Sequence, residues 1–250
     1  MTTPRFTRRR GPRPAPDAEQ RMALVEHLRE LRDRLIRVVL SVILTTSLSF
    51  LFINQLMQLF LNLLPKQPNI HVQVFEPAEA FTSYFKVALT FGIVLAMPLI
   101  VYQVFRFLAP GLTGKERRWL LLSLPMITVF FLAGVVFCYT LVLPSALNFL
   151  LNFGSPQIEQ NQRLSSFIGF VTNFMLAVGI TFELPPVMFL LAKLGVVSAK
   201  RMSRVRRFVV VIAFIVAAII TPTPDPVNQT IVALPIYLLY ELGLLFARLA

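Results

Sequence analysis

The chain has 250 residues, of which 56% are hydrophobic and only 14% are charged, and its mean hydropathy is +0.71. A soluble domain carries about 25% charged residues, so this composition argues against soluble enzymes, free nucleic-acid binders and disordered proteins. The apolar runs are continuous and do not alternate over short segments, which predicts an α-helical membrane protein and not a membrane β-barrel.

The N-terminal part of the chain combines a basic leader with an amphipathic segment. Residues 1–20 are rich in Arg and Pro and have almost no apolar content, which predicts a disordered cytoplasmic leader. Residues 22–36 place four leucines on one helical stripe, and Glu30 and Arg34 form an i,i+4 pair in the favourable order. We expect an amphipathic helix that lies at the membrane surface and runs into the first span.

Six hydrophobic segments follow, and residues 21–250 are expected to form one transmembrane domain. A helix needs about 20 apolar residues to cross the hydrocarbon core. The segments cover approximately residues 38–58, 87–105, 119–143, 164–192, 208–221 and 227–247. The apolar run that contains the first segment continues to residue 64. The fifth segment and the charge-free start of the sixth have only 14 residues each, and the Pro-rich link Thr221–Pro226 cannot continue a helix. The last two helices are therefore expected to be short.

The distribution of Lys and Arg predicts the orientation in the membrane. Short cytoplasmic loops carry an excess of these residues. With six spans, 21 of the 24 basic residues fall on the side of both termini, and only Lys66, Lys86 and Arg163 fall on the other side. Both termini are therefore expected to be cytoplasmic, and the net charge of +12 reflects topology and not nucleic-acid binding.

The sequence offers no pattern of soluble-enzyme chemistry. Residues 110–115 approach a phosphate-binding loop, but Ala109 stands where the first Gly is required and Glu116 where Ser or Thr is required. His27 and His71, the two histidines, fall on opposite sides of the membrane, so no His-based metal site or protease is supported. We expect no enzyme activity, no metal and no cofactor.

Four acidic residues remain as functional candidates. Glu183 lies inside the fourth span, where a carboxylate costs several kcal/mol unless it is neutralised or partnered, and the adjacent Pro185–Pro186 pair predicts a kink with a polar notch. Glu241 lies in the sixth span near the interface, while Glu30 and Glu116 are predicted at the cytoplasmic surface. Each also fits a purely structural role, as a hydrogen-bonded acid within a span or as part of a surface ion pair.

A series of short motifs runs along residues 24–248 in a fixed order. They are His27-Leu-Arg-Glu-Leu-Arg32, Glu79-Ala-Phe81 with Lys86, Tyr102-Gln103, Phe107-Leu-Ala-Pro-Gly111, Lys115-Glu-Arg-Arg118, Phe182-Glu-Leu-Pro185, Thr221-Pro222, Asp225, Gln229-Thr230, Pro235 and Tyr240-Glu241. In this order, and with six spans, they resemble the TatC family, the signal-receptor core subunit of the twin-arginine protein translocase. The Thr-Pro-Thr-Pro-Asp sequence that ends at Asp225 has one residue more than the family pattern.

The resemblance implies a curved, glove-like arrangement of six helices and a function in protein export. The family binds the twin-arginine signal peptides of folded proteins at its cytoplasmic face, through one acid in the N-terminal motif and one in the second loop. Those acids correspond to Glu30 and Glu116, with Arg32 and Phe107 in the same two motifs. A guanidinium pairs bidentately with a carboxylate, so two separated carboxylates would require two arginines.

The resemblance also implies partners and a location. Expected partners are single-span subunits of the TatA and TatB type, further copies of the chain in a receptor complex, and the lipid bilayer, with the proton-motive force as the energy source. Glu183, Asp225, Gln229 and Glu241 are the polar candidates for contacts with partner helices. The expected location is the inner membrane of a bacterium rather than a plastid thylakoid.

Two other functions remain open at this point. A proton-coupled transporter would use Glu183 and Glu241 as a proton relay, although no inverted repeat is visible in the sequence. A passive membrane scaffold would bind no substrate.

Overall fold

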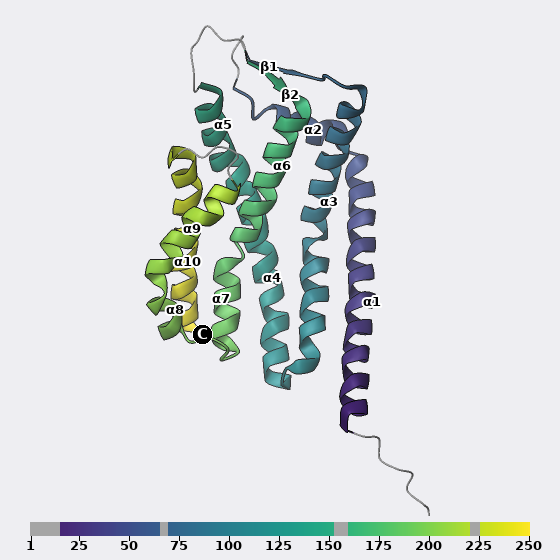
Figure 1. The fold of residues 1–250 in the computed structure, drawn as a ribbon, viewed down its shortest axis with the longest axis vertical. Coiled ribbons are helices and arrows are strands. Elements are labelled where there is room, and N and C mark those ends of the chain that lie inside the picture. The colour runs from purple at the N-terminus through teal and green to yellow at the C-terminus, as the bar shows by residue number, and fades with distance from the viewer. Residues whose placement is uncertain (1–15, 66–69, 153–159, 221–225) are drawn as a thin grey trace, which may run out of the picture.

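The computed structural model describes residues 16–65, 70–152, 160–220 and 226–250, and nearly all of them are helical (Figure 1). The elements in chain order are α1 (Pro16–Phe50), α2 (Ile53–Leu61), β1 (Ile70–Gln73), α3 (Pro77–Leu108), the 3-10 turn η1 (Ala109–Gly111), α4 (Gly114–Phe137), the π-helical turn η2 (Cys138–Val142), α5 (Leu143–Asn152), β2 (Gln160–Arg163), α6 (Leu164–Thr181), α7 (Leu184–Lys193), α8 (Ala199–Arg204), α9 (Arg206–Ile220) and α10 (Pro226–Leu249). The predicted all-helical fold class is confirmed.

The helices form a row in which each contacts the next: α1 against α3, α3 against α4, α4 against α7, α7 against α10, and α10 against α9, with α6 packed on α3 and α4 (Figure 1). One end of the row holds the N-terminal half of α1, the α3–α4 turn, α8 and the C-terminus (the lower end of Figure 1). We call this the basic end. The strands β1 and β2 lie at the opposite end.

The described residues contain four helical segments that are long and apolar enough to cross a membrane. They are Pro77–Leu108, Gly114–Leu151, Leu164–Lys193 and Gln229–Leu249. The bent pair Val25–Phe50 and Ile53–Leu61 supplies a fifth if it counts as one span. The remaining predicted span is α9, whose 15 residues are fewer than a full crossing needs.

The first apolar run turns before it ends. α1 continues from Pro16 to Phe50 without a break, so the predicted surface helix and the start of the first span are one helix that begins inside the expected leader. A straight helix over residues 38–64 would be about 40 Å long, whereas the hydrocarbon core is about 30 Å thick. The chain instead bends by 81°, and α2 buries Met57 and Phe60 in the core.

The third and fourth predicted spans each contain two helices. α4 passes into α5 through η2, so this segment extends beyond its predicted end at residue 143. α6 and α7 are separated at Phe182 and Glu183, because Pro185 and Pro186 have no N–H to continue the hydrogen-bond ladder. The interruption of the helix predicted at these prolines is confirmed, and Leu164–Lys193 still counts as one span.

Only one of the last two helices is short. α9 has 15 residues, but α10 has 24 and continues past Glu241, which was expected to limit its apolar part. Arg206 at the start of α9 forms a salt bridge with Glu241, so this carboxylate is paired inside the chain. The link that contains Asp225 lies outside the described residues.

Two contacts fix the helices that carry the candidate site. At the crossing of α1 and α3, Thr45 Oγ1 donates a hydrogen bond to the carbonyl of Gly92 (2.8 Å), and a Cβ at Gly92 would lie 2.8 Å from the Cα of Thr46. At the opposite end, the buried Glu79 carboxylate accepts hydrogen bonds from the N–H groups of Phe75 (2.8 Å) and Ser165 (2.9 Å). Glu79 therefore joins the segment before α3 to the start of α6, beside the parallel pairing of β1 with β2.

Candidate functional site

The candidate site lies at the basic end, where α1 passes beside the α3–α4 turn (Figure 1). The His27 ring stacks on the Phe107 ring, with 4.4 Å between centroids and 19° between planes. About two helical turns after His27 on α1, Arg34 Nη1 lies 3.5 Å from Gln103 Oε1. These contacts hold the N-terminal half of α1 against the end of α3.

Glu30 lies between these two contacts on α1. Its Oε1 accepts hydrogen bonds from Arg34, and its side chain is 30% exposed while that of Arg34 is 12% exposed. The predicted i,i+4 pair is therefore confirmed. Because Arg34 is mostly buried and also contacts Gln103, its guanidinium is a fixed competitor for any cation that approaches Glu30.

Glu116 forms part of a capping box at the start of α4. Its Oε2 accepts a hydrogen bond from the Thr113 N–H (2.7 Å), and the Thr113 side chain accepts one from the Glu116 backbone N–H. The carboxylate is thus oriented by its own helix, where the helix dipole favours negative charge. The structural alternative for Glu116 was a surface ion pair, but the carboxylate serves as a helix cap instead. The Thr-x-x-Glu spacing of residues 113–116 could have indicated this cap.

The other two residues expected in the site have different local roles. Arg32 forms a salt bridge with Asp33 (2.8 Å), and both side chains are largely exposed. Among the described contacts, none joins Arg32 to Glu30 or Glu116. Phe107 provides the surface on which His27 stacks, so it fixes α1 and supports the acid site indirectly.

Glu183 lies at the break between α6 and α7, inside the membrane-spanning part of the fold. It is 9% exposed, and neither carboxylate oxygen has a hydrogen-bond partner in the part of the chain that the structure describes. Burial of a polar group without a hydrogen bond is costly. Both oxygens are buried as well as unpartnered, so a group from outside this chain could reach them only if the neighbouring side chains moved.

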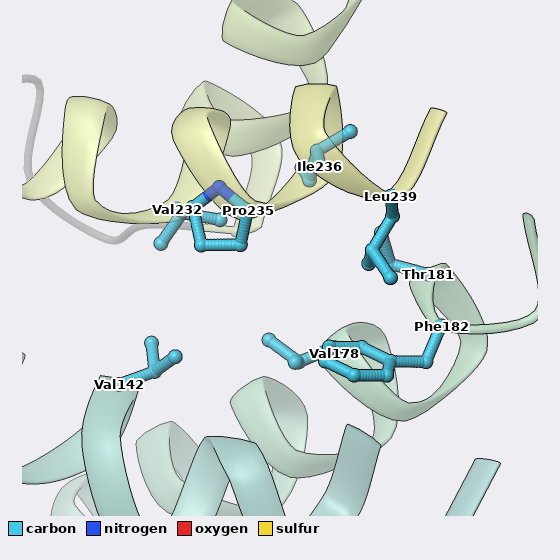
Figure 2. A pocket seen from close by; sticks show the side chains of 8 residues that line it. All are labelled: Val142, Val178, Thr181, Phe182, Val232, Pro235, Ile236 and Leu239. Atoms are coloured by element: carbon cyan, nitrogen blue, oxygen red, sulfur yellow. The ribbon is translucent and has the colours of Figure 1, made fainter. Parts of the chain in front are cut away.

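The cavity next to the break is apolar and small. Figure 2 shows it between the end of α6 and the middle of α10, with Val178 and Phe182 facing Pro235 and Leu239. Its volume is about 10 Å³, too little for a side chain. This cavity is not the polar notch that was expected beside the prolines.

The remaining polar candidates of the last two helices are engaged within the chain. Gln229 Nε2 donates to the Phe214 carbonyl of α9 (3.2 Å), and Glu241 is paired with Arg206. No hydrogen bond between Glu183 and Glu241 is found in the described ranges. The structure therefore does not join them into a relay.

Comparison with known proteins decides the family. A family profile described as Sec-independent protein translocase protein (TatC) matches residues 26–235. The chain belongs to the TatC family. It is therefore a membrane-spanning component of the Sec-independent protein translocase, and the predicted family resemblance is confirmed.

TatC proteins of known sequence and structure resemble this chain over most of its length. The chain is 34% identical to TatC of Carboxydothermus hydrogenoformans over 229 residues, which is 91% of this chain and 93% of the relative. It is 38% identical to TatC of Deinococcus radiodurans over 249 residues, covering 94% and 89%. A crystal structure of the twin-arginine translocase receptor TatC is 34% identical, covers 89% of this chain and 98% of its own, and superposes with a TM-score of 0.77.

Proposed function

We propose that this TatC-family chain is the receptor core of the translocase and binds twin-arginine signal peptides at its basic end through Glu30 and Glu116. The observation that carries the proposal is the capping box of Glu116, because it holds a carboxylate in a defined orientation at the α3–α4 turn. α1, which bears Glu30, is fixed at the same end by the His27–Phe107 stack.

Carboxylates held on two separate helices favour a pair of arginines as the ligand. A guanidinium offers a planar fork that bonds both oxygens of a carboxylate, whereas an ammonium is a point charge without a fork. Glu30 and Glu116 each have a local partner that fixes the side chain before the ligand arrives. The site is thus suited to recognise two guanidiniums on one extended peptide.

The proposal extends to orientation and partners. The basic end faces the cytoplasm, because 21 of the 24 Lys and Arg residues fall on that side in the six-span topology. The membrane is the inner membrane of a bacterium, and the partners are single-span subunits of the TatA and TatB type together with further copies of this chain. The proton-motive force drives export, and the chain itself performs no enzymatic step.

The transporter alternative has less support than the receptor. A relay through Glu183 and Glu241 requires both acids to exchange protons, but Arg206 already neutralises Glu241. The buried and unpartnered Glu183 fits a contact with a partner's transmembrane helix that displaces its neighbours, and such a hydrogen bond is worth about 0.6 to 2 kcal/mol.

The test of the proposed function is binding of signal peptides that differ only at the arginine pair. The full chain in nanodiscs should bind an Arg-Arg peptide at least about tenfold more tightly than a Lys-Lys peptide, since hydrogen bonds to charged groups contribute about 1.5 to 3 kcal/mol. Fluorescence anisotropy of labelled peptides measures the ratio. Equal affinity for the two peptides would contradict the proposal, because charge alone would then explain binding.

A further inference from the structure

A second feature of the basic end is a pocket between the end of α3 and the start of α4. Its volume is about 240 Å³. Arg106 and Tyr102 of α3 and Arg117 of α4 line it, together with the apolar side chains of Phe105, Leu120 and Leu121. The signal-binding acids Glu30 and Glu116 are not among its lining residues.

The two guanidiniums of this pocket are unneutralised in the described part of the chain. Arg106 is held in place by Tyr102, since its Nη1 donates to the Tyr102 hydroxyl (3.0 Å) and its Cζ lies 5.9 Å from the centre of the ring. Arg117 forms no described ion pair, and the acid next to it in sequence, Glu116, caps its own helix. Two like charges that line one pocket without a carboxylate favour an anionic ligand.

On the α4 side, the lining of the pocket becomes apolar toward the membrane interior. Phe105 and Leu120 form a buried floor, and Leu121, which is 47% exposed, follows one turn after Arg117 along α4 toward the membrane interior. Along α4 the lining thus changes from guanidinium to hydrocarbon in the direction in which a lipid changes from phosphate to acyl chain. A soluble phosphate would use only the charged part.

We propose that this pocket binds one anionic phospholipid of the leaflet at the basic end, with its phosphate between Arg106 and Arg117 and an acyl chain along Leu121. Basic pockets between transmembrane helices are suited to anionic head groups, because each Lys or Arg near the surface adds to the attraction. Arg106, which the sequence explains only as a topology charge, and Arg117 of the second-loop motif thereby acquire a ligand. The pocket does not include Glu30 or Glu116, although Arg117 directly follows Glu116, and the proposal does not depend on signal recognition.

The test is lipid binding to the purified full chain in a neutral detergent, measured by native mass spectrometry during titration with phosphatidylglycerol. The wild-type chain should retain one phosphatidylglycerol more tightly than phosphatidylethanolamine. The double variant Arg106→Gln, Arg117→Gln should bind phosphatidylglycerol at least about tenfold more weakly. A matched control, Lys200→Gln, Arg204→Gln, removes two charges from α8 at the same end and should leave the affinity unchanged.

Circular dichroism of each variant verifies that the helices are intact, so a loss of lipid can be assigned to the pocket. The proposal is overturned if the Arg106 and Arg117 variant retains phosphatidylglycerol as the wild type does, or if the α8 control loses as much. A parallel titration with inorganic phosphate separates the two sources of phosphate. Protection of the fold by inorganic phosphate at the same concentrations as the lipid would also overturn it, because the acyl chain would then contribute nothing.

Discussion

Replacement of Glu116 by Gln is expected to weaken the binding of a twin-arginine signal peptide about tenfold or more while the fold stays unchanged. Gln at this position can still accept the hydrogen bond from Thr113, because Glu and Gln both complete a capping box. Only the charge is lost, and a hydrogen bond to a charged group contributes about 1.5 to 3 kcal/mol. Peptide titration gives the affinity, and thermal unfolding of the same sample verifies the cap.

Further substitutions separate the cap, the charge and the competing arginine. Glu116→Ala should weaken binding similarly but should also lower the melting temperature, because it removes the cap.

Glu30→Gln should have the smaller effect, because Arg34 already competes for that carboxylate. Glu26→Gln, an exposed acid one helical turn before Glu30, is the matched charge control. If Glu116→Gln binds the peptide as well as Glu26→Gln does, the assignment of the loop acid is wrong.

Substitution of Glu183 should produce the second large effect, on the association of partner subunits. Glu183→Leu is expected to abolish co-purification of single-span partners and export, because a partner's polar side chain would lose its hydrogen-bond acceptor inside the membrane. Glu183→Gln keeps hydrogen-bonding capacity and should preserve most of both. The melting temperature of the isolated Glu183→Leu chain should not fall, since the substitution removes a buried polar group that has no partner.

The Gln variant decides between docking and proton relay. Gln cannot release a proton, so a relay through Glu183 would stop as completely in Glu183→Gln as in Glu183→Leu. Loss of export in both variants with normal partner association would therefore refute the docking role and favour the transporter mechanism. Partner co-purification and export have to be measured on the same membranes for this comparison.

Helix positions were predictable from local sequence, whereas helix pairing was not. The long apolar runs predict α3, α4, α6 and α10, and the Pro185–Pro186 pair predicts the break between α6 and α7. The bend after Phe50 was missed because no proline or glycine marks it; it follows from the excess length of the apolar run over the bilayer. The expected bounds of the sixth segment agree with α10, but its membrane-crossing part was expected to be short because the pairing of Glu241 with Arg206 is a tertiary contact.

The candidate site shows the same division between local and tertiary contacts. The Glu30–Arg34 pair follows from its i,i+4 spacing, and the capping box of Glu116 could have been identified from Thr113 three residues earlier. The stack of His27 on Phe107 joins residues far apart in the chain, so no local pattern predicts it. That stack nevertheless helps to fix the helix that carries Glu30.

The central claim is that the two arginines of a signal peptide lie at the acids of the basic end, and photo-crosslinking from the peptide tests it most directly. A photoreactive residue next to the arginine pair leaves Glu30 and Glu116 intact, and mass spectrometry locates the adduct on the chain. We expect adducts within residues 112–118 and 26–34, and their loss with a Lys-Lys peptide. Adducts on β1, β2 or the adjoining start of α6, at the opposite end of the bundle, or adducts that persist unchanged with the Lys-Lys peptide, would contradict the account.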